Sequence, residues 1–362
     1  MARLVIDGGD LKAAYRGKRV LITGHTGFKG SWLTICLREL GAEIAGYALE
    51  PETKNDLFVQ ARLEKALRHT VADVRDLSSL QQAFESFAPE YVFHLAAQPL
   101  VRRSFVEPKL TFDTNVAGSV NVLEAVRNTP SVRALVYVTS DKCYRNREWS
   151  WGYRENDELG GHDPYSASKA AAEIVFASYV DSFFFQRPTL GAASARAGNV
   201  VGGGDWAVDR IVPDCMRSLI KGEPIKLRNP ASTRPWQHVL EPVVAYLTLG
   251  AKLFEDPSAF GGAWNIGPAV KSIRTVEELA RSIVDEWGSG EVKALRNDNE
   301  PHEAQLLHLN CDKAELRLGW RPRWDFERTI KETVAWYSAV HKGADSARVS
   351  RDQACRYLEE LR

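Results

Sequence analysis

Short apolar runs alternate with amphipathic segments through the first half of the chain. The run RVLIT at 19–23 is rich in β-branched residues and ends at a glycine, and comparable runs lie at 43–49, 91–95 and 134–139. Apolar residues with helical spacing follow at 31–40, and further amphipathic segments begin at Asp76 and Thr114. Strands and helices that alternate in this way predict βαβ units with right-handed crossovers. We therefore predict an α/β fold built on a doubly wound parallel sheet.

This regular alternation ends near residue 195. Beyond it, GGGDW from Gly202, KLRNPASTRPW from Lys226 and proline-spaced segments up to Pro322 alternate less regularly. We expect residues 1–195, together with part of 235–267, to form the sheet domain. Residues 196–234 and 268–362 should form a smaller C-terminal α/β domain.

Charge and cysteine content exclude several classes of protein. The 362 residues carry 47 Lys and Arg against 47 Asp and Glu, so the formal net charge is zero. Proteins that bind nucleic acid or anionic membranes usually carry a basic excess, so we expect neither partner. The five cysteines are scattered without a C-x-x-C pair, and no run of eighteen apolar residues or signal peptide is present, which favours a reduced, cytoplasmic enzyme without a bound metal.

A glycine-rich loop connects the first predicted strand to the first predicted helix. It reads Gly24-His-Thr-Gly27-Phe-Lys-Gly30. Glycines at these positions permit a tight turn, and the N-terminus of the helix that follows offers backbone N–H groups to a pyrophosphate. Because the loop has the required strand before it and helix after it, it predicts a Rossmann-type dinucleotide site.

Acidic and small residues after the next strands define the rest of this site. Glu50 would accept hydrogen bonds from a free ribose 2′-hydroxyl, which favours NAD over NADP. Asp73 could bind the adenine amino group or cap the following helix, and both interpretations stay open. The expected NAD contacts are Gly24, Thr26, Gly27, Phe28, Lys29, Gly30, Glu50, Asp73, Val74, Leu95, Ala96, Ala97, Gln98, Tyr165 and Lys169.

Two segments carry candidate catalytic residues. Tyr165 and Lys169 are four residues apart in a predicted helix, so both side chains lie on one face, where the ammonium should lower the pKa of the phenol. Ser140, Asp141 and Lys142 follow the strand at 134–139 and therefore lie at the carboxyl edge of the sheet. Together these side chains can supply a base, an acid and a hydrogen-bond donor.

The motifs taken together resemble the extended short-chain dehydrogenase/reductases that act on nucleotide sugars. The resemblance covers nearly the whole chain through the glycine loop, HLAAQ, TNVAGSVNVLEA, the spacing of Ser140, Tyr165 and Lys169, and WNIGP. TGHTGFKGSWL, TSDKCYRNREWSWGYREND and RAGNVVGGGDW are similar to the branch of 4,6-dehydratases that acts on CDP-glucose. Other branches typically have Thr-Asp-Glu where this chain has Ser140-Asp141-Lys142.

This resemblance implies a dehydration in three steps. Tyr165 would take the proton of the sugar 4-hydroxyl while hydride leaves C4 for NAD, with Ser140 bonded to the same oxygen and Lys169 holding the phenolate. Loss of the C5 proton and of the C6 hydroxyl would follow, with Asp141 as the acid, before hydride returns to C6. Lys142 would be either the neutral base at C5 or a cation that stabilises the enolate.

The resemblance also implies where the substrate binds and how subunits associate. CDP-glucose, a small-molecule substrate, would contact Arg102, Ser104, Arg196, Asn199, Arg234 and His302. A homodimer is expected through the helix of Tyr165 and the helix that begins near Thr114, with a homotetramer as the alternative. A dehydratase for another nucleotide sugar, a 4-epimerase and a non-catalytic NAD-binding protein are the competing hypotheses.

Overall fold

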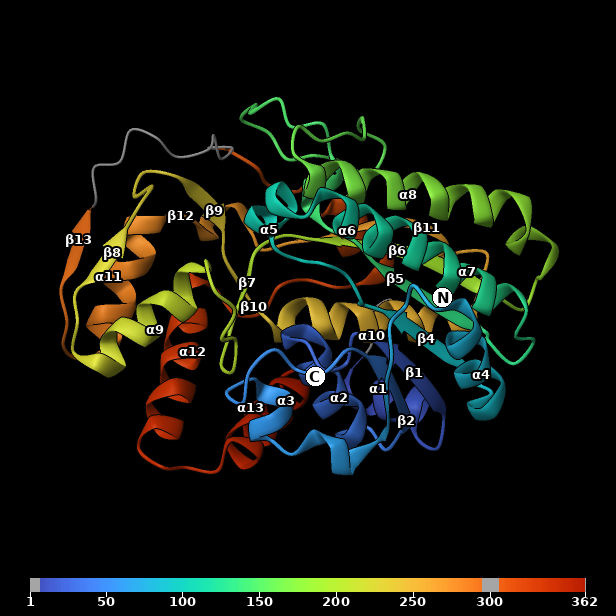
Figure 1. Cartoon of the computed structure of the whole chain (residues 1–362), viewed down its shortest axis with the longest axis horizontal. Helices are drawn as coiled ribbons and strands as arrows, with labels where there is room; N and C mark the ends of the chain where they lie inside the picture. The colour runs from blue at the N-terminus through green and yellow to red at the C-terminus, as the bar shows by residue number, and fades with distance from the viewer. Residues whose placement is uncertain (1–6, 295–305, 362) are drawn as a thin grey trace.

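A seven-stranded parallel sheet forms the centre of the computed structural model, which describes residues 7–294 and 306–361 (Figure 1). The strand order is β11-β6-β5-β4-β1-β2-β3, and every neighbouring pair runs parallel. The doubly wound α/β fold predicted from the sequence is confirmed. The strands are β1 (Arg19–Thr23), β2 (Glu43–Ala48), β3 (Arg68–Val71), β4 (Tyr91–His94), β5 (Ala134–Val138), β6 (Gly191–Ala197) and β11 (Gly262–Ile266).

Helices cover both faces of this sheet. Neighbouring strand residues point to opposite faces, so Val20 and Ile22 of β1 enter one apolar cluster and Leu21 enters the other. Both faces are therefore buried, which explains why the strands are continuous apolar runs. One face packs against α4 (Leu77–Phe87), α7 (Gly118–Arg127) and α8 (Pro164–Ser182), and the other against α1 (Gly8–Tyr15), α2 (Phe28–Glu39) and α10 (Leu240–Glu255).

The strand order reverses direction beside β1, which pairs with β2 on one side and with β4 on the other. In open α/β sheets a ligand crevice lies at the carboxyl ends of the strands at such a switch point. The loops after β1, β4 and β5 meet at this edge, together with the short helices α3 (Leu57–Gln60), α5 (Val101–Val106) and α6 (Pro108–Phe112).

A smaller α/β unit lies at one end of the sheet (Figure 1). Its helices are α9 (Ile211–Lys221), α11 (Val276–Trp287) and α12 (Phe326–His341). Its strand pairs are β8 (Ile225–Leu227) with β13 (Val292–Ala294), β9 (Thr233–Pro235) with β12 (Ile273–Thr275), and β7 (Val200–Val201) with β10 (Gln237–His238). Within the described ranges no helix has the length and apolar character needed to cross a lipid bilayer.

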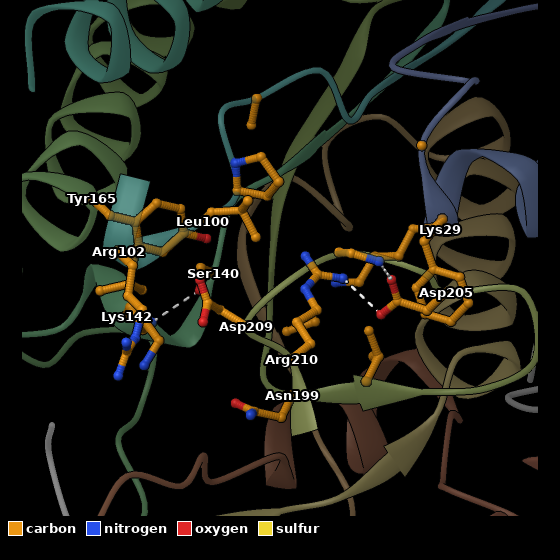
Figure 2. A pocket seen from close by; sticks show the side chains of 18 of the residues that line it. Lys29, Leu100, Arg102, Ser140, Lys142, Tyr165, Asn199, Asp205, Asp209 and Arg210 are labelled. Atoms are coloured by element: carbon orange, nitrogen blue, oxygen red, sulfur yellow. Dashed lines mark hydrogen bonds and ion pairs between the residues drawn. The ribbon is translucent and has the colours of Figure 1, made fainter. Parts of the chain in front are cut away.

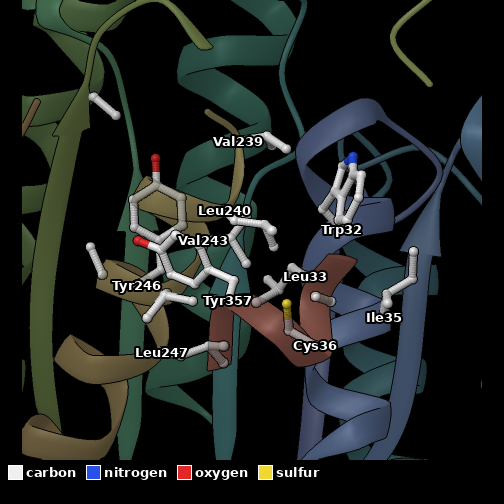
Figure 3. Packing of buried hydrophobic residues seen from close by; sticks show 14 of the residues in the cluster. Trp32, Leu33, Ile35, Cys36, Val239, Leu240, Val243, Tyr246, Leu247 and Tyr357 are labelled. Atoms are coloured by element: carbon white, nitrogen blue, oxygen red, sulfur yellow. The ribbon is translucent and has the colours of Figure 1, made fainter. Parts of the chain in front are cut away.

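The last helix, α13 (Ser346–Glu359), leaves this smaller unit and packs on α2 below the sheet. Figure 3 shows Tyr357 of α13 in the same buried cluster as Trp32 of α2 and Leu240 of α10. Glu241 holds the helix by accepting hydrogen bonds from the Tyr357 hydroxyl and from the backbone N–H of Trp324. The sequence placed residues 268–362 in the smaller domain, and α13 departs from that division because its apolar face covers the sheet domain.

Candidate active site

One cleft of about 970 Å³ runs along the carboxyl edge of the sheet, between the sheet domain and the smaller unit. Tyr165, Ser140 and Lys142 lie on one side of it, and Lys29 and Arg210 on the other (Figure 2). Most of the residues predicted from the sequence line this cleft. They are Gly24, Thr26, Gly27, Phe28, Lys29, Gly30, Glu50, Asp73, Val74, Leu95, Ala96, Ala97, Arg102, Ser140, Asp141, Lys142, Tyr165, Lys169, Asn199 and Arg234.

The glycine loop needs glycine for steric reasons. A Cβ on Gly30 would lie 2.2 Å from the carbonyl oxygen of Gly24, and a Cβ on Gly24 would lie 2.6 Å from the backbone nitrogen of Ala96. Gly24 also adopts a φ of +78°, in the left-handed region. Gly27 caps α2 without a side-chain hydrogen bond, so the first N–H groups of this helix are open to a ligand. The loop therefore fits a pyrophosphate.

The acidic residues lie at the far end of the same cleft. Glu50 is exposed two residues after β2 and lines the cleft. Asp73 accepts hydrogen bonds from the backbone and the guanidinium of Arg75, which lower the pKa of its carboxyl group. The cap of α4 is Asp76, which accepts from the backbone N–H of Ser79, so Asp73 is not the helix cap that the sequence left open.

The end of β5 places three candidate catalytic side chains at the cleft. The Ser140 hydroxyl donates to Asp141 Oδ1 at 3.0 Å and accepts from the Lys142 backbone N–H at 3.2 Å. Asp141 is buried, and among the described residues its Oδ2 atom has no hydrogen-bond partner. A buried carboxyl oxygen without a partner is suited to exchange a proton with a ligand in the cleft.

Helix α8 supplies the other half of the catalytic set. Asp163 caps this helix by accepting from the backbone N–H of Ser166, and Tyr165 and Lys169 project from one face into the cleft. Ser140 influences the pKa of Tyr165 and both residues line the cleft, so the two segments meet there.

The charge state of this pair differs from the sequence prediction. Burial raises the pKa of Tyr165 to about 12 and outweighs the influence of Ser140, which favours the phenolate. Burial also lowers the pKa of Lys169 to about 8. The expectation that Lys169 brings the phenol pKa below its ordinary value is therefore wrong for this arrangement of side chains.

Three predicted site residues do not line the cleft. Gln98 is buried in its own turn, where its side chain bonds to Leu100 and Thr111. Ser104 accepts the backbone N–H of Tyr165 and so supports the start of α8. Arg196 is buried in an ion pair with Glu173 at 2.7 Å, which takes its guanidinium out of reach of a substrate. His302 lies outside the described residues.

The end of the cleft beside α9 is lined by more arginine and lysine side chains than the sequence predicted. Besides Arg234 on β9, it is lined by Arg210 before α9, and by Lys226 and Arg228 on and after β8. It is also lined by Asp205, Asp209 and Asp214, which pair with two of these arginines. Arg210 pairs with the buried Asp205 at 3.0 Å. The sequence signal for these basic side chains was the pair Lys226 and Arg228 at alternate positions. In the described ranges no group of three or more His, Cys, Asp or Glu side chains could hold a metal ion.

Comparison with known proteins agrees with this geometry. Residues 21–333 match the model of the family described as GDP-mannose 4,6 dehydratase. The chain is 46% identical over 351 residues to a CDP-glucose 4,6-dehydratase from Salmonella typhimurium, an alignment that covers 96% of this chain and 98% of the relative. The resemblance identified from the sequence motifs is thereby confirmed.

Solved structures give the same fold. A UDP-glucose 4-epimerase from Thermus thermophilus in complex with NAD has a TM-score of 0.75 at 27% identity, covering 90% of this chain and 99% of the other. A dTDP-glucose 4,6-dehydratase from Bacillus anthracis, also in complex with NAD, has a TM-score of 0.75 at 21% identity, covering 91% and 100%. Because the family model matches residues 21–333, which are most of this chain, the chain belongs to the GDP-mannose 4,6-dehydratase family.

Proposed function

We propose that this protein is an NAD-dependent hydro-lyase that converts CDP-glucose to CDP-4-keto-6-deoxyglucose. The observation that carries the proposal is the meeting of Ser140, Asp141 and Lys142 with Tyr165 and Lys169 at one cleft that also contains the glycine loop. The 46% identity to the Salmonella CDP-glucose 4,6-dehydratase supports cytosine as the nucleotide base, which no side chain identifies by itself.

The residues at the switch point are suited to hold NAD. Gly24, Gly27 and Gly30 line the cleft beside the N-terminus of α2, which would bind a pyrophosphate, and Glu50 would bind the free 2′-hydroxyl of the adenosine ribose. Asp73 and Val74 would flank the adenine. When bound, NAD supplies the chemistry of accepting a hydride from C4 of the sugar and returning it to C6.

Oxidation at C4 requires removal of the proton from the sugar 4-hydroxyl. Tyr165 Oη is the acceptor for this proton, because Tyr165 lines the cleft together with Ser140 and Lys169. Ser140 would donate its hydrogen bond to the same sugar oxygen. The Tyr165 phenolate accepts this proton and becomes a neutral phenol, and the Lys169 ammonium on the same helix face stabilises the phenolate that must be present before the step.

The 4-ketone acidifies C5, so elimination needs a group at C5 and an acid at the C6 hydroxyl. Asp141 is the acid, because its Oδ2 atom is buried and without a partner among the described residues. Lys142 also lines the cleft and acts at C5, either as the base or as the cation that stabilises the enolate.

The nucleotide diphosphate should bind at the end of the cleft that is lined by arginines. Arg234, Arg210 and Asn199 line this end, and a guanidinium can contact two phosphate oxygens at once. Arg102 lies on the opposite wall beside Lys142 (Figure 2) and would contact the sugar.

The decisive experiment is incubation of the purified protein with CDP-, UDP-, GDP- and dTDP-glucose in deuterated water with NAD. We expect CDP-glucose to lose one water molecule and to gain one deuterium at C5, without a net consumption of NAD. Recovery of every sugar unchanged would exclude a dehydratase. Dehydration of one of the other nucleotide sugars but not of CDP-glucose would support the dehydratase reaction and reject cytosine as the nucleotide base.

A 4-epimerase is the second candidate, because a solved UDP-glucose 4-epimerase shares the fold. Epimerisation leaves the mass of the sugar unchanged and expels no C6 hydroxyl, so it would leave Asp141 without a task. A C4 epimer among the products would therefore favour this alternative.

We also propose that the protein forms a homodimer through α7 and α8. These helices lie next to each other on one face of the sheet (Figure 1). Ile174 in α8 and Phe183 directly after it expose apolar surface. Sedimentation at micromolar concentration should give twice the mass of the 40.4 kDa chain. A single monomeric species would contradict this interface.

A further inference from the structure

A buried carboxylate lies behind the catalytic residues, on the same helix. Glu173 follows Lys169 by one turn of α8, as Lys169 follows Tyr165, so the three side chains share one face. Its exposed fraction is only 3%. Glu173 is not among the predicted site residues, and the proposed reaction does not use it directly.

Glu173 joins the two catalytic segments. One of its oxygens accepts a hydrogen bond from the Thr139 hydroxyl, immediately before Ser140, and the other accepts from Ser194 Oγ of β6 at 2.8 Å. The carboxylate therefore connects the helix that carries Tyr165 and Lys169 to the strand end that carries Ser140, Asp141 and Lys142.

Arg196 extends this connection to the loop after β5. Its NH2 group donates to Glu173 at 2.7 Å, and its NH1 group donates to the Tyr144 hydroxyl at 2.8 Å and to the Glu155 carbonyl at 2.9 Å. Tyr144 in turn donates to Asn265 of β11 at 2.7 Å. Among the described residues only the Nε atom of Arg196 in this network lacks a partner. A network of hydrogen-bonded buried polar groups can fix one geometry where an apolar core would tolerate several.

We propose that Glu173 and Arg196 are positioning residues that set the spacing of the two catalytic segments, and that Glu173 places a fixed negative charge beneath Lys169. The inference rests on the proposed function, because it assumes that Lys169 acts as a cation beside Tyr165. Arg196, which the sequence assigned to the substrate, thus serves the reaction from behind the site.

The other charged and titratable groups around Lys169 do not replace this charge. Burial raises the pKa of the Cys143 thiol and lowers that of His94 to about 3, so both are neutral at neutral pH. Lys29 of α2 also faces the site and interacts unfavourably with the ammonium. Burial of Lys169 lowers its pKa to about 8, and Glu173 is the largest opposing influence.

The test compares Glu173→Gln with the double variant Glu173→Gln/Arg196→Met. The single variant leaves a buried guanidinium without its partner and can fail to fold. The double variant removes both charges at similar volume and restores a neutral core, yet it still lacks the charge beneath Lys169. We expect the alkaline limb of the kcat profile to move down by about one pH unit in the double variant.

A second readout needs no activity. The pH dependence of Lys169 acylation by an amine-reactive reagent, followed by peptide mass spectrometry on the chain without cofactor, should shift in the same direction. Glu124→Gln is the matched control, because Glu124 also pairs with an arginine and bonds to α8 through Tyr179. It should leave both profiles unchanged.

The outcomes separate the two proposals. If the wild-type protein dehydrates no sugar but the double variant shifts the labelling profile, the charge role of Glu173 stands and the proposed function is rejected. Wild-type dehydration together with unshifted kcat and labelling profiles in the double variant would overturn the role of Glu173. Equal shifts in Glu124→Gln would also overturn it, because the effect would then not depend on position.

Discussion

Replacement of Tyr165 by Phe should lower kcat for dehydration by about 10²- to 10⁴-fold, the range that a positioned proton acceptor contributes. The substitution removes only the Tyr165 hydroxyl and keeps the buried ring. Because the sugar 4-hydroxyl then keeps its proton, the loss should occur at the first chemical step. Single-turnover mixing of enzyme, NAD and CDP-glucose should show no transient absorbance of reduced cofactor.

The affinity for substrate provides the control for this variant. The diphosphate contacts proposed at Arg234 and Arg210 do not involve Tyr165, so the dissociation constant for CDP-glucose should stay within a few-fold of the wild-type value. A variant that still reduces the cofactor at the wild-type rate would show that another group takes the proton. Ser140→Ala should be less severe, because it removes one hydrogen bond and leaves the acceptor in place.

Local sequence patterns predicted the elements that are determined by residues close together in the chain. Three elements combine a residue type that suits a particular backbone conformation with a regular spacing of apolar residues. They are the glycine loop, the strand at 134–139 and the helix after Pro164, and the structure has all three. β3 was missed because it lies at the edge of the sheet and three of its four residues are exposed. β6 was missed because its buried sequence, GAASARA, is rich in alanine, which is depleted in strands.

Long-range partners explain the site residues that sequence reasoning misplaced. The family resemblance placed Arg196 at the nucleotide diphosphate, and only the fold reveals that Glu173, 23 residues earlier, neutralises it. The pKa of Tyr165 could not be derived from the Y-x-x-x-K spacing either, because burial by distant segments outweighs the effect of local charges. A residue type predicts which chemistry is possible, whereas its partners decide which chemistry it performs.

Replacement of Lys142 by Met should stop elimination while sparing C4 oxidation. Lys142 lines the cleft next to Ser140 and Asp141, and Met has a similar length without the amine. Both of the roles open to Lys142 act at C5, so we expect exchange of the C5 proton with deuterated solvent to fall by about 10²-fold or more. The reduced cofactor should accumulate, because the sugar stays at the 4-keto stage.

Lys142→Arg separates the two roles. Arginine stays protonated at any working pH, so it can stabilise an enolate but cannot accept the C5 proton. If Lys142 is the base, the Arg variant should be as slow as the Met variant in C5 exchange. If Lys142 acts as a cation, the Arg variant should retain a measurable part of the rate, with the Met variant much slower. Exchange at the wild-type rate in both variants would exclude either role, and the proton acceptor at C5 would then have to be sought among the other groups of the cleft, beginning with Asp141.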